Sequence, residues 1–401
     1  MRLDPSDPAA PQLTYCLNIH PGESWSDARK NVERHALPVR AATAPDRPFG
    51  MGLRLSRRAA DEWRALPDTT RRDQVAAWRR DGLYVFTLNG FPYGAFHGRP
   101  VKENVYAPDW NRDERRDYTL ALAEALADFL PADEPLGTIS TVPLGFRPRM
   151  SQPRDIRSAC VRLAHIVRQL RRLEQERGAR IVLALEPEPG CVLETTDLTI
   201  ACWNERLLPG VRRELLDAGG WTGSEAEAAA RAHLGLCLDT CHFAVLGEDP
   251  AAALRAFRAA GIAVPKIQLS AALRLAGGPD AAERLRAFEE PVYLHQTTAW
   301  KDGRRVGYWH DLPAACASGI AADEWRVHFH VPLDWAGDIA LGSTAAGLTP
   351  DFWRAARETP HVEVETYTFD VLPPSLRAGG VDESVIRELR WAREKLERAR
   401  A

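Results

Sequence analysis

The sequence predicts a parallel α/β barrel of the (β/α)8 type. Three stretches of the 401-residue chain carry this prediction, because each joins an apolar run to polar side chains at its end. Five apolar residues precede the Glu-Pro-Glu-Pro-Gly turn within Ile181–Gly190, and Leu234–His242 and His361–Tyr367 repeat the arrangement. Short apolar runs bounded by glycine or proline are typical of strands buried on both faces. Buried parallel strands that end in polar groups build the functional site of a barrel at their carboxyl ends.

The composition is that of an ordinary globular protein, with 45% hydrophobic and 27% charged residues. The formal net charge of −3 provides no basic field that would attract nucleic acid or an anionic membrane. We expect a cytoplasmic protein without membrane insertion, because the first residues lack an apolar leader and no long apolar run follows. The seven cysteines show neither the spacing of a zinc ribbon nor that of a disulfide framework, and Cys237 and Cys241 are interpreted as small buried residues.

Strand-like and helix-like segments alternate along the chain, which is typical of a parallel α/β architecture. We expect a single domain over residues 1–401, with a loose tail at 1–11, an insertion at 279–345 and a C-terminal helix at 382–400. A doubly wound sheet is the alternative, but no strand end carries the Gly-x-Gly-x-x-Gly turn typical of that fold. The predicted strands are Leu13–His20, Gly50–Leu55, Leu83–Asn89, Gly137–Val142, 181–185, Leu234–His242, Val264–Ser270 and His361–Tyr367.

Helix starts are marked by capping residues. Ser24 followed by Asp27 resembles a capping box and predicts a helix that runs to about Ala36. Asp249 followed by Pro250 is the favoured start of another helix. Further helices are predicted at Thr70–Arg80, Asn111–Leu130, 156–173, Asp197–Ala218 and Ser224–His233.

The segment before the last strand contains more strand-like runs than a barrel needs. Val292–Thr297 and Arg305–His310 are predicted to form a hairpin around Asp302-Gly303. Trp325–Leu333 is a ninth strand-like run, and we assign it to an extended loop between the last two barrel strands. The aromatic stretch Gly90–Trp110 is a long loop that we expect to wall a pocket, with simple packing on the barrel rim as the alternative.

The strand ends combine carboxylate, imidazole and amide groups, which suit a divalent cation such as Mn²⁺, Zn²⁺, Co²⁺ or Mg²⁺. Among the acids, Glu186 is preferred to Glu188, which is interpreted as a solvated turn residue. Glu365 lies nearer the strand end than Glu363, which points the same way and would lie lower in the barrel. The candidate residues at the strand ends are Glu186, Asp239, His242, Gln268, His330 and Glu365.

Other polar residues at strand ends are expected to contact a substrate. Asn18, His20 and Asn89 lie at the ends of the first and third predicted strands and are interpreted as hydrogen-bond partners of the substrate. His330 is expected to contact the substrate too, with an approach to the metal as the alternative. Three other histidines, His233, His295 and His361, are interpreted as ordinary surface or rim residues.

The motifs at the strand ends resemble those of a known superfamily. Leu-Glu-Pro-Glu-Pro-Gly at 185–190, Leu-Asp-Thr-Cys-His at 238–242 and Val-Glu-Thr-Tyr at 364–367 resemble the xylose isomerase-like TIM barrels. Tyr15–Glu23, Thr87–Gly94 and Glu365–Thr368 are similar to the EboE family of metabolite-traffic proteins, over nearly the whole chain.

This resemblance implies a metal held by Glu186, Asp239 and Glu365, with Gln268 in the place where the superfamily commonly has histidine. It also implies that His242 touches the substrate or the metal. The histidine that endonuclease IV-type enzymes carry after the fourth strand is missing, because residues 137–145 offer only serine and threonine there.

The residues and the resemblance together suggest a metal-dependent isomerase or epimerase that acts on a sugar or cyclitol-like polyol. The EboE resemblance implies that this protein acts in metabolite traffic, that is, in the movement of natural-product precursors. Glu186 and Glu365 would remove and return a proton, with His242 as a third catalytic residue. Partners encoded in the same gene cluster are implied by the EboE resemblance. The alternatives are a non-catalytic carrier barrel and, as the weakest, an endonuclease IV-like phosphodiesterase.

Overall fold

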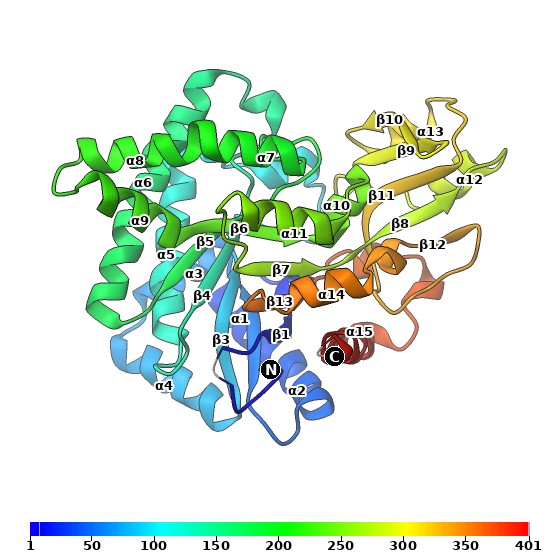
Figure 1. Cartoon of the computed structure of the whole chain (residues 1–401). Helices are drawn as coiled ribbons and strands as arrows, with labels where there is room; N and C mark the ends of the chain where they lie inside the picture. Colours follow the sequence, from blue (N-terminus) through cyan, green and yellow to red (C-terminus); the bar gives the residue numbers. More distant parts are fainter. Residues whose placement is uncertain (8, 400–401) are drawn as a thin grey trace.

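The computed structural model describes residues 1–7 and 9–399 (Figure 1). In this part of the chain the main sheet has eight parallel strands, in the spatial order β1-β13-β7-β6-β5-β4-β3-β2. A parallel bridge between Cys16 and Gly52 brings β1 beside β2, so that the sheet curls into the predicted (β/α)8 barrel. The barrel strands are β1 Gln12–Tyr15, β2 Phe49–Arg54, β3 Leu83–Asn89, β4 Gly137–Thr141, β5 Ile181–Leu185, β6 Leu234–Asp239, β7 Lys266–Leu269 and β13 His361–Val364.

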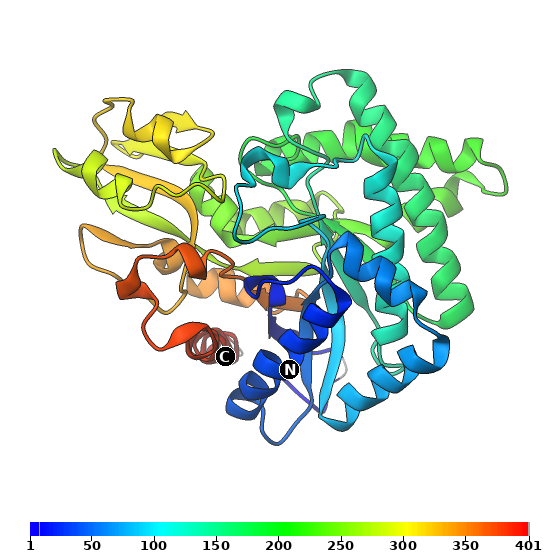
Figure 2. The same ribbon diagram turned by 180° about the vertical axis from the view of Figure 1, so that it is seen from behind.

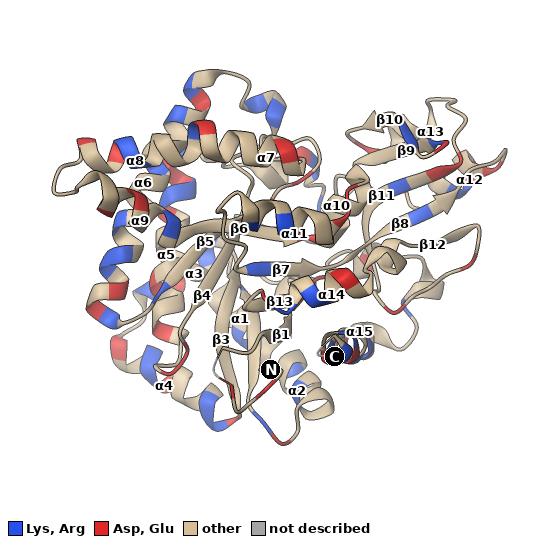
Figure 3. Ribbon diagram, in the orientation of Figure 1, with Lys and Arg blue, Asp and Glu red and all other residues tan. Residues whose placement is uncertain are grey.

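Helices cover the outside of the barrel, and Figure 3 shows charged residues of both signs scattered over them, with few on the barrel strands. The strands are buried on both faces, which explains their nearly continuous apolar sequences. Among the described residues, no helix is both long and apolar enough to cross a membrane. The covering helices are α1 Trp25–Asn31, α2 Leu37–Thr43, α3 Arg57–Ala65, α4 Asp68–Arg80, α5 Asp113–Phe129, α6 Pro153–Arg177, α7 Thr196–Cys202, α8 Leu208–Asp217, α9 Gly223–His233, α10 Thr240–Leu246, α11 Pro250–Ala259, α14 Pro350–Ala356 and α15 Gly380–Arg398.

The predicted capping box at the start of α1 is confirmed. The Ser24 hydroxyl accepts a hydrogen bond from the Asp27 backbone at 3.1 Å, and the Asp27 carboxylate accepts one from the Ser24 backbone at 3.0 Å. Helical structure continues beyond the predicted end at Ala36, because a π-helical turn at Val32–Ala36 joins α1 to α2. Pro38, two residues after Ala36, is a sequence signal for the end of a helix, but in the structure it lies in the first turn of α2, so helical structure continues past it.

An inserted sheet leaves the barrel directly after β7 and lies beside it in both views (Figures 1 and 2). Its strands within the described residues pair antiparallel in the order β10-β9-β11-β8-β12. The insertion therefore begins at Ala271, earlier than the predicted residue 279. Its elements are β8 Ala271–Ala276, α12 Ala281–Arg286, β9 Thr297–Lys301, β10 Arg304–Trp309, α13 Leu312–Cys316, β11 Glu324–Val331 and β12 Leu341–Ser343.

Two expectations about the insertion need correction. The assignment of Trp325–Leu333 to an extended loop is wrong, because β11 lies inside the inserted sheet between β9 and β8. The hairpin around Asp302-Gly303 is confirmed, but its first strand begins at Thr297 rather than at Val292. The sequence predicts one strand more than the barrel can hold, and it does not show that a second sheet exists in which this strand could pair.

Residues 1–11 do not form a loose tail where the structure describes them, and residue 8 lies outside the described part. Met1 and Leu3 are buried, the terminal amine donates a hydrogen bond to the Leu13 backbone, and Arg2 pairs with Gln12 in an antiparallel bridge. The Arg2 guanidinium also forms an ion pair with Glu134 at 2.7 Å. The first residues therefore extend the packed base of the barrel.

The predicted C-terminal helix is present as α15, although residue 400 of the predicted range lies outside the described residues. Its Glu388 side chain is fully buried and joins the helix to the barrel and to the insertion. The carboxylate accepts hydrogen bonds from the Leu333 backbone at 3.0 Å and from the Thr366 hydroxyl at 2.7 Å. Because Thr366 follows Glu365, this contact also supports the backbone of the candidate site.

Glu388 predicts a loss of stability as the pH rises. Burial raises the pKa of Glu388 from 4.5 to about 7 in the folded chain. The folded protein therefore holds this proton more tightly than the unfolded chain does, and the stabilisation present at low pH disappears between pH 4.5 and 7. The shift corresponds to about 3 kcal/mol. Urea unfolding of wild type and Glu388→Gln across this pH range should show wild type losing that amount relative to the variant, and parallel pH profiles would contradict it.

Candidate functional site

Three carboxylates meet at the carboxyl ends of the barrel strands. Glu186 directly follows β5, Asp239 ends β6 and Glu365 directly follows β13. One oxygen of each lies within 4.8 Å of the others, and all three side chains are buried. Parallel strands bring their ends to one edge, so the convergence expected from the sequence is present.

Asp239 has one satisfied and one free carboxylate oxygen. Its Oδ1 accepts hydrogen bonds from the Ser270 hydroxyl and from the Cys241 backbone at 2.8 Å, as the N-cap of α10. Its Oδ2 has no hydrogen-bond partner among the described residues. A buried oxygen without a partner is costly, so Oδ2 is suited to a positively charged ligand.

Glu365 is held by two amides, one from Asn18 in the turn after β1 and one from Asn89 at the end of β3. Asn18 donates to its Oε1 at 2.7 Å, and Asn89 donates to the same oxygen at 3.0 Å. Both amides line the cavity described below, so their predicted place near a substrate fits this geometry. Their contact with Glu365 also fixes the orientation of that carboxylate.

The electrostatics of the three acids differ. Burial raises the pKa of Glu186 well above its usual value, and the carboxyls of Glu365 and Asp239 raise it further. Burial also raises the pKa of Glu365, as do the Asp239 and Glu363 carboxyls. Burial works in the same direction on Asp239, but His242, His330 and the hydrogen bond from Ser270 outweigh it and lower the pKa of Asp239.

A buried ion pair lies in the barrel beneath these acids and involves Glu363, the acid that the sequence places lower in the barrel. Lys266 on β7 contacts Glu363 on β13 at 2.6 Å, and neither side chain is exposed. Burial works to lower the pKa of Lys266, and the Glu363 carboxylate outweighs it and raises that pKa. Gly52 makes room for the pair, because a Cβ at this position would lie 1.7 Å from a Glu363 oxygen.

A cavity opens above the acids, between the barrel and the inserted sheet. The loop Gly90–Trp110 forms one wall, which confirms the prediction made from its length and aromatic content. The insertion supplies Tyr293, Leu294 and His328 on the other side. The lining residues are Asn18, Asn89, Phe91, Pro92, Phe96, Val101, Lys102, Val105, Tyr106, Glu186, Glu188, His242, Tyr293, Leu294, His328, Glu365 and Tyr367.

Glu188 is buried in this cavity, so its interpretation as a solvated turn residue is wrong. Its Oε1 accepts hydrogen bonds from the Tyr106 hydroxyl at 2.6 Å and from the Gln296 amide at 3.4 Å. The two partners come from the Gly90–Trp110 loop and from the insertion. Neither contact could be predicted from the sequence, because the sequence does not indicate where the loop and the insertion lie relative to β5.

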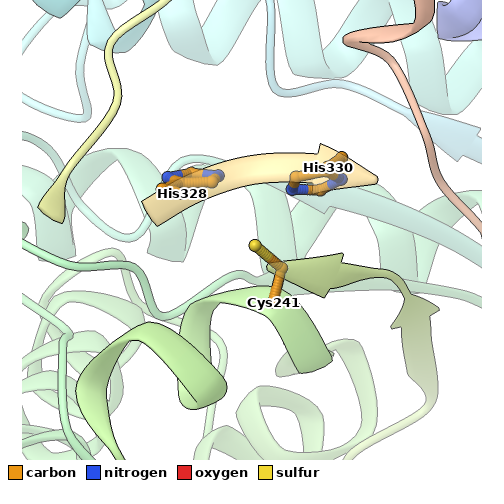
Figure 4. A group of neighbouring side chains, drawn as sticks. All are labelled: Cys241, His328 and His330. Atoms are coloured by element: carbon orange, nitrogen blue, oxygen red, sulfur yellow. The ribbon is translucent and has the colours of Figure 1, made fainter. Parts of the chain in front are cut away.

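Three histidines surround the acids, and each is anchored through Nδ1. His242 donates to the Pro187 carbonyl at 2.9 Å, and His330 donates to the Glu365 carbonyl at 2.8 Å. His328 donates to the Gln296 side-chain oxygen at 2.6 Å. Figure 4 shows His328 and His330 side by side on β11, above Cys241 of α10. Burial lowers the pKa of His330 to about 4, so this imidazole is neutral at neutral pH.

Other candidate residues lie away from the cavity lining. The His20 ring stacks on His35 and its Nε2 lies 3.2 Å from the Tyr15 hydroxyl, so the structure does not bring it to the acids. Gln268 is buried beside Asp239 in the register of β6 and β7, and its oxygen accepts a hydrogen bond from the Cys237 thiol at 3.2 Å. Its role as a metal ligand stays a prediction.

The histidines assigned to the surface or rim are buried instead, which corrects that expectation. His361 lies inside the barrel, 2.8 Å from the Thr138 hydroxyl, and His233 contacts the Ile181 carbonyl at 2.9 Å. His295 contacts the Glu290 carboxylate at 2.6 Å. The contacts of His361 and His233, and a further contact of His295 with the His328 carbonyl at 2.7 Å, join segments that are far apart in the sequence.

No protein-family model and no curated protein matches this sequence. Among solved structures, IolI with a bound zinc atom is similar at 11% identity and a TM-score of 0.48, over 96% of this chain and 98% of that chain. A D-tagatose 3-epimerase-like protein has 10% identity and a TM-score of 0.47, over 97% and 98% of the two chains. A xylose isomerase-like TIM barrel protein from Mycobacterium smegmatis in complex with magnesium has 11% identity and a TM-score of 0.48, over 98% of each. At this level of identity, none of the three assigns an activity, substrate or metal to this chain.

Proposed function

We propose that this protein is a metal-dependent isomerase or epimerase of an uncharged sugar or cyclitol-like polyol. The observation that carries the proposal is the convergence of Glu186, Asp239 and Glu365 on one buried point beneath a cavity. Separate strands position the three acids, so the site is held by the rigid part of the fold rather than by a single loop.

The donor set fits a divalent ion. Oε2 of Glu186 and Oδ2 of Asp239 are buried and have no hydrogen-bond partner among the described residues. Carboxylate oxygens of this kind, with imidazoles nearby, suit Mn²⁺, Zn²⁺, Co²⁺ or Mg²⁺. When bound, such an ion would act as a Lewis acid that draws electron density from a substrate carbonyl oxygen.

The residues of the chain would move the proton. Glu186 and Glu365 reach the site from different strands, so one would remove the proton from the carbon next to the carbonyl and the other would return one. Return at the same carbon on the opposite face inverts it, and return at the neighbouring carbon moves the carbonyl. The raised pKa of both carboxyls suits this role, since general acids and bases work best near the ambient pH. His242, 4.0 Å from Glu186, would orient or assist that carboxylate.

The cavity favours a substrate without phosphate or carboxylate. Three lining residues are acids, and Lys102 is the one lysine or arginine among the described lining residues. Its ammonium group is engaged by Asp311 at 2.8 Å and by the Glu290 carbonyl at 3.1 Å. The aromatic side chains of the wall would pack on the apolar face of a ring, while Asn18 and Asn89 offer polar contacts. The three acids of the lining would also repel the negative charge of a phosphodiester substrate.

The biological setting is part of the proposal. The similarity of Tyr15–Glu23 and Thr87–Gly94 to the EboE family supports a role in the traffic of metabolite precursors, with partners encoded in the same gene cluster. A carrier that binds the same class of ligand without converting it is the second candidate. The observation that favours a carrier is the enclosure of the acids by aromatic side chains, because such an enclosure would hold a bound ligand whether or not the ligand is converted.

Exchange with solvent tests the proposal directly. The Mn²⁺-loaded protein is incubated in D2O with a panel of ketoses and inosose-type cyclitols, and deuterium in the recovered compounds is measured by mass spectrometry. We expect deuterium at a carbon next to the carbonyl of one member of the panel. Thermal stabilisation by a compound that takes up no deuterium would favour the carrier, and neither effect from any compound would contradict both candidates.

A further inference from the structure

We propose that the inserted sheet supplies a metal ligand, with His330 Nε2 completing the coordination of an ion held at Asp239 Oδ2. This inference rests on the proposed metal centre and adds a ligand that lies outside the barrel. It assigns the insertion a direct part in the site, since β11 would hold the ion together with the strands of the barrel.

The two atoms face each other across a space of suitable size. His330 Nε2 and Asp239 Oδ2 lie 4.0 Å apart, both side chains are fully buried, and neither atom has a hydrogen-bond partner among the described residues. His242 belongs to the same group, because one possible ligand atom from each of Asp239, His242 and His330 lies within 4.8 Å of the other two. An ion at ordinary bonding distances of about 2.0–2.2 Å from zinc-type ligands fits between a nitrogen and an oxygen at this separation.

The orientation of His330 is fixed as it is in metal sites. Its Nδ1 donates to the carbonyl of Glu365, one of the candidate ligands, which leaves Nε2 as the acceptor nitrogen. Anchoring of the second ring nitrogen is the usual device that holds a ligating histidine in place. The pairing of β11 with β8 shifts register between Val327 and His330, and such irregularities redirect side chains near functional sites.

His330 also replaces a ligand that Gln268 is poorly placed to provide. The Gln268 oxygen already accepts a hydrogen bond from the Cys237 thiol, and its unpartnered atom is the amide nitrogen. An amide nitrogen carries hydrogens and no free lone pair, so it does not bind a cation. Of the two residues, His330 is therefore the one with a free donor atom close to Asp239 Oδ2.

Metal binding to His330→Gln tests this assignment. Metal-free wild type and variant are titrated with Co²⁺, followed by visible absorption, and the Cu²⁺-loaded forms are examined by electron spin echo envelope modulation for a coordinated imidazole. We expect the variant to bind Co²⁺ at least about 100-fold more weakly, since loss of an outer contact to a ligand already costs 10–100-fold. We also expect the imidazole modulation of wild type to be reduced or lost.

One control variant and one stability measurement keep the result interpretable. His165→Gln changes a partly exposed histidine on α6 and should leave both measurements unchanged. Equal thermal unfolding of the metal-free forms shows that His330→Gln folds. Unchanged Co²⁺ affinity, an imidazole signal lost only in His242→Gln, or a thiolate band lost in Cys241→Ser would overturn the inference while leaving a metal site in place. Absence of any bound metal in wild type would overturn the proposed function as well.

Discussion

Replacing Lys266 by methionine is expected to lower the free energy of unfolding by about 3–5 kcal/mol, because it leaves a buried charge without its partner. Lys266 Nζ lies 2.6 Å from Glu363 Oε2 and donates to the Ser140 hydroxyl at 3.2 Å, with no exposed surface on the lysine or the glutamate. Without the ammonium group, Glu363 must take up a proton or draw water into the barrel. Chemical denaturation of the metal-free proteins at neutral pH measures the difference.

The double variant Lys266→Met with Glu363→Gln is the matched control. It removes both charges together, and replacing both members of a buried ion pair is often close to neutral. We expect most of the lost stability to return, which distinguishes a stranded charge from simple loss of packing at Lys266. A single variant as stable as wild type would show that the pair contributes nothing to the fold.

Glu186→Gln is expected to slow proton exchange in the substrate by about 10²–10⁴-fold, the usual contribution of a positioned general acid or base. The amide keeps the shape of the side chain but neither accepts nor releases a proton at the working pH. Glu186 is chosen because it lines the cavity and because burial raises the pKa of its carboxyl, which suits a group that takes up and releases a proton. Deuterium incorporation from D2O, measured at saturating metal and substrate, reports the effect.

Glu188→Gln offers a close comparison, since the same change is made two residues away in the same cavity. Glu188 is held by Tyr106 and Gln296, and we expect its replacement to change substrate affinity more than the exchange rate at saturation. Equal losses of rate in the two variants, or a larger loss in Glu188→Gln, would contradict the assignment of the proton to Glu186.

Much of the barrel follows from local sequence patterns. Apolar runs such as Ile181–Leu185 are buried strands, and the residue that follows each run is delivered to the same edge because parallel strands end there. The meeting of Glu186, Asp239 and Glu365 depends only on that rule. The capping box at Ser24 is equally local, since its two hydrogen bonds join residues three positions apart.

The parts that were not predicted depend on contacts between distant segments. β11 is an apolar run like those of the barrel, so its place in a second sheet is decided by its pairing with β8 and β9. The same applies to Lys266, which lies within an apolar strand and gains its partner from β13. The only local sequence signal for this part of the site was the alternate spacing of His328 and His330, which places both side chains on one face of β11.

Metal uptake by the purified, chelator-treated protein tests the central claim most directly. Equilibrium dialysis against Mn²⁺ or Zn²⁺, followed by elemental analysis, should show an ion bound to wild type and lost from Asp239→Asn, whose side chain has the same shape without the negative charge. Wild type that retains no more metal than Asp239→Asn, while both remain folded, would contradict the proposal that Glu186, Asp239 and Glu365 converge to hold a cation.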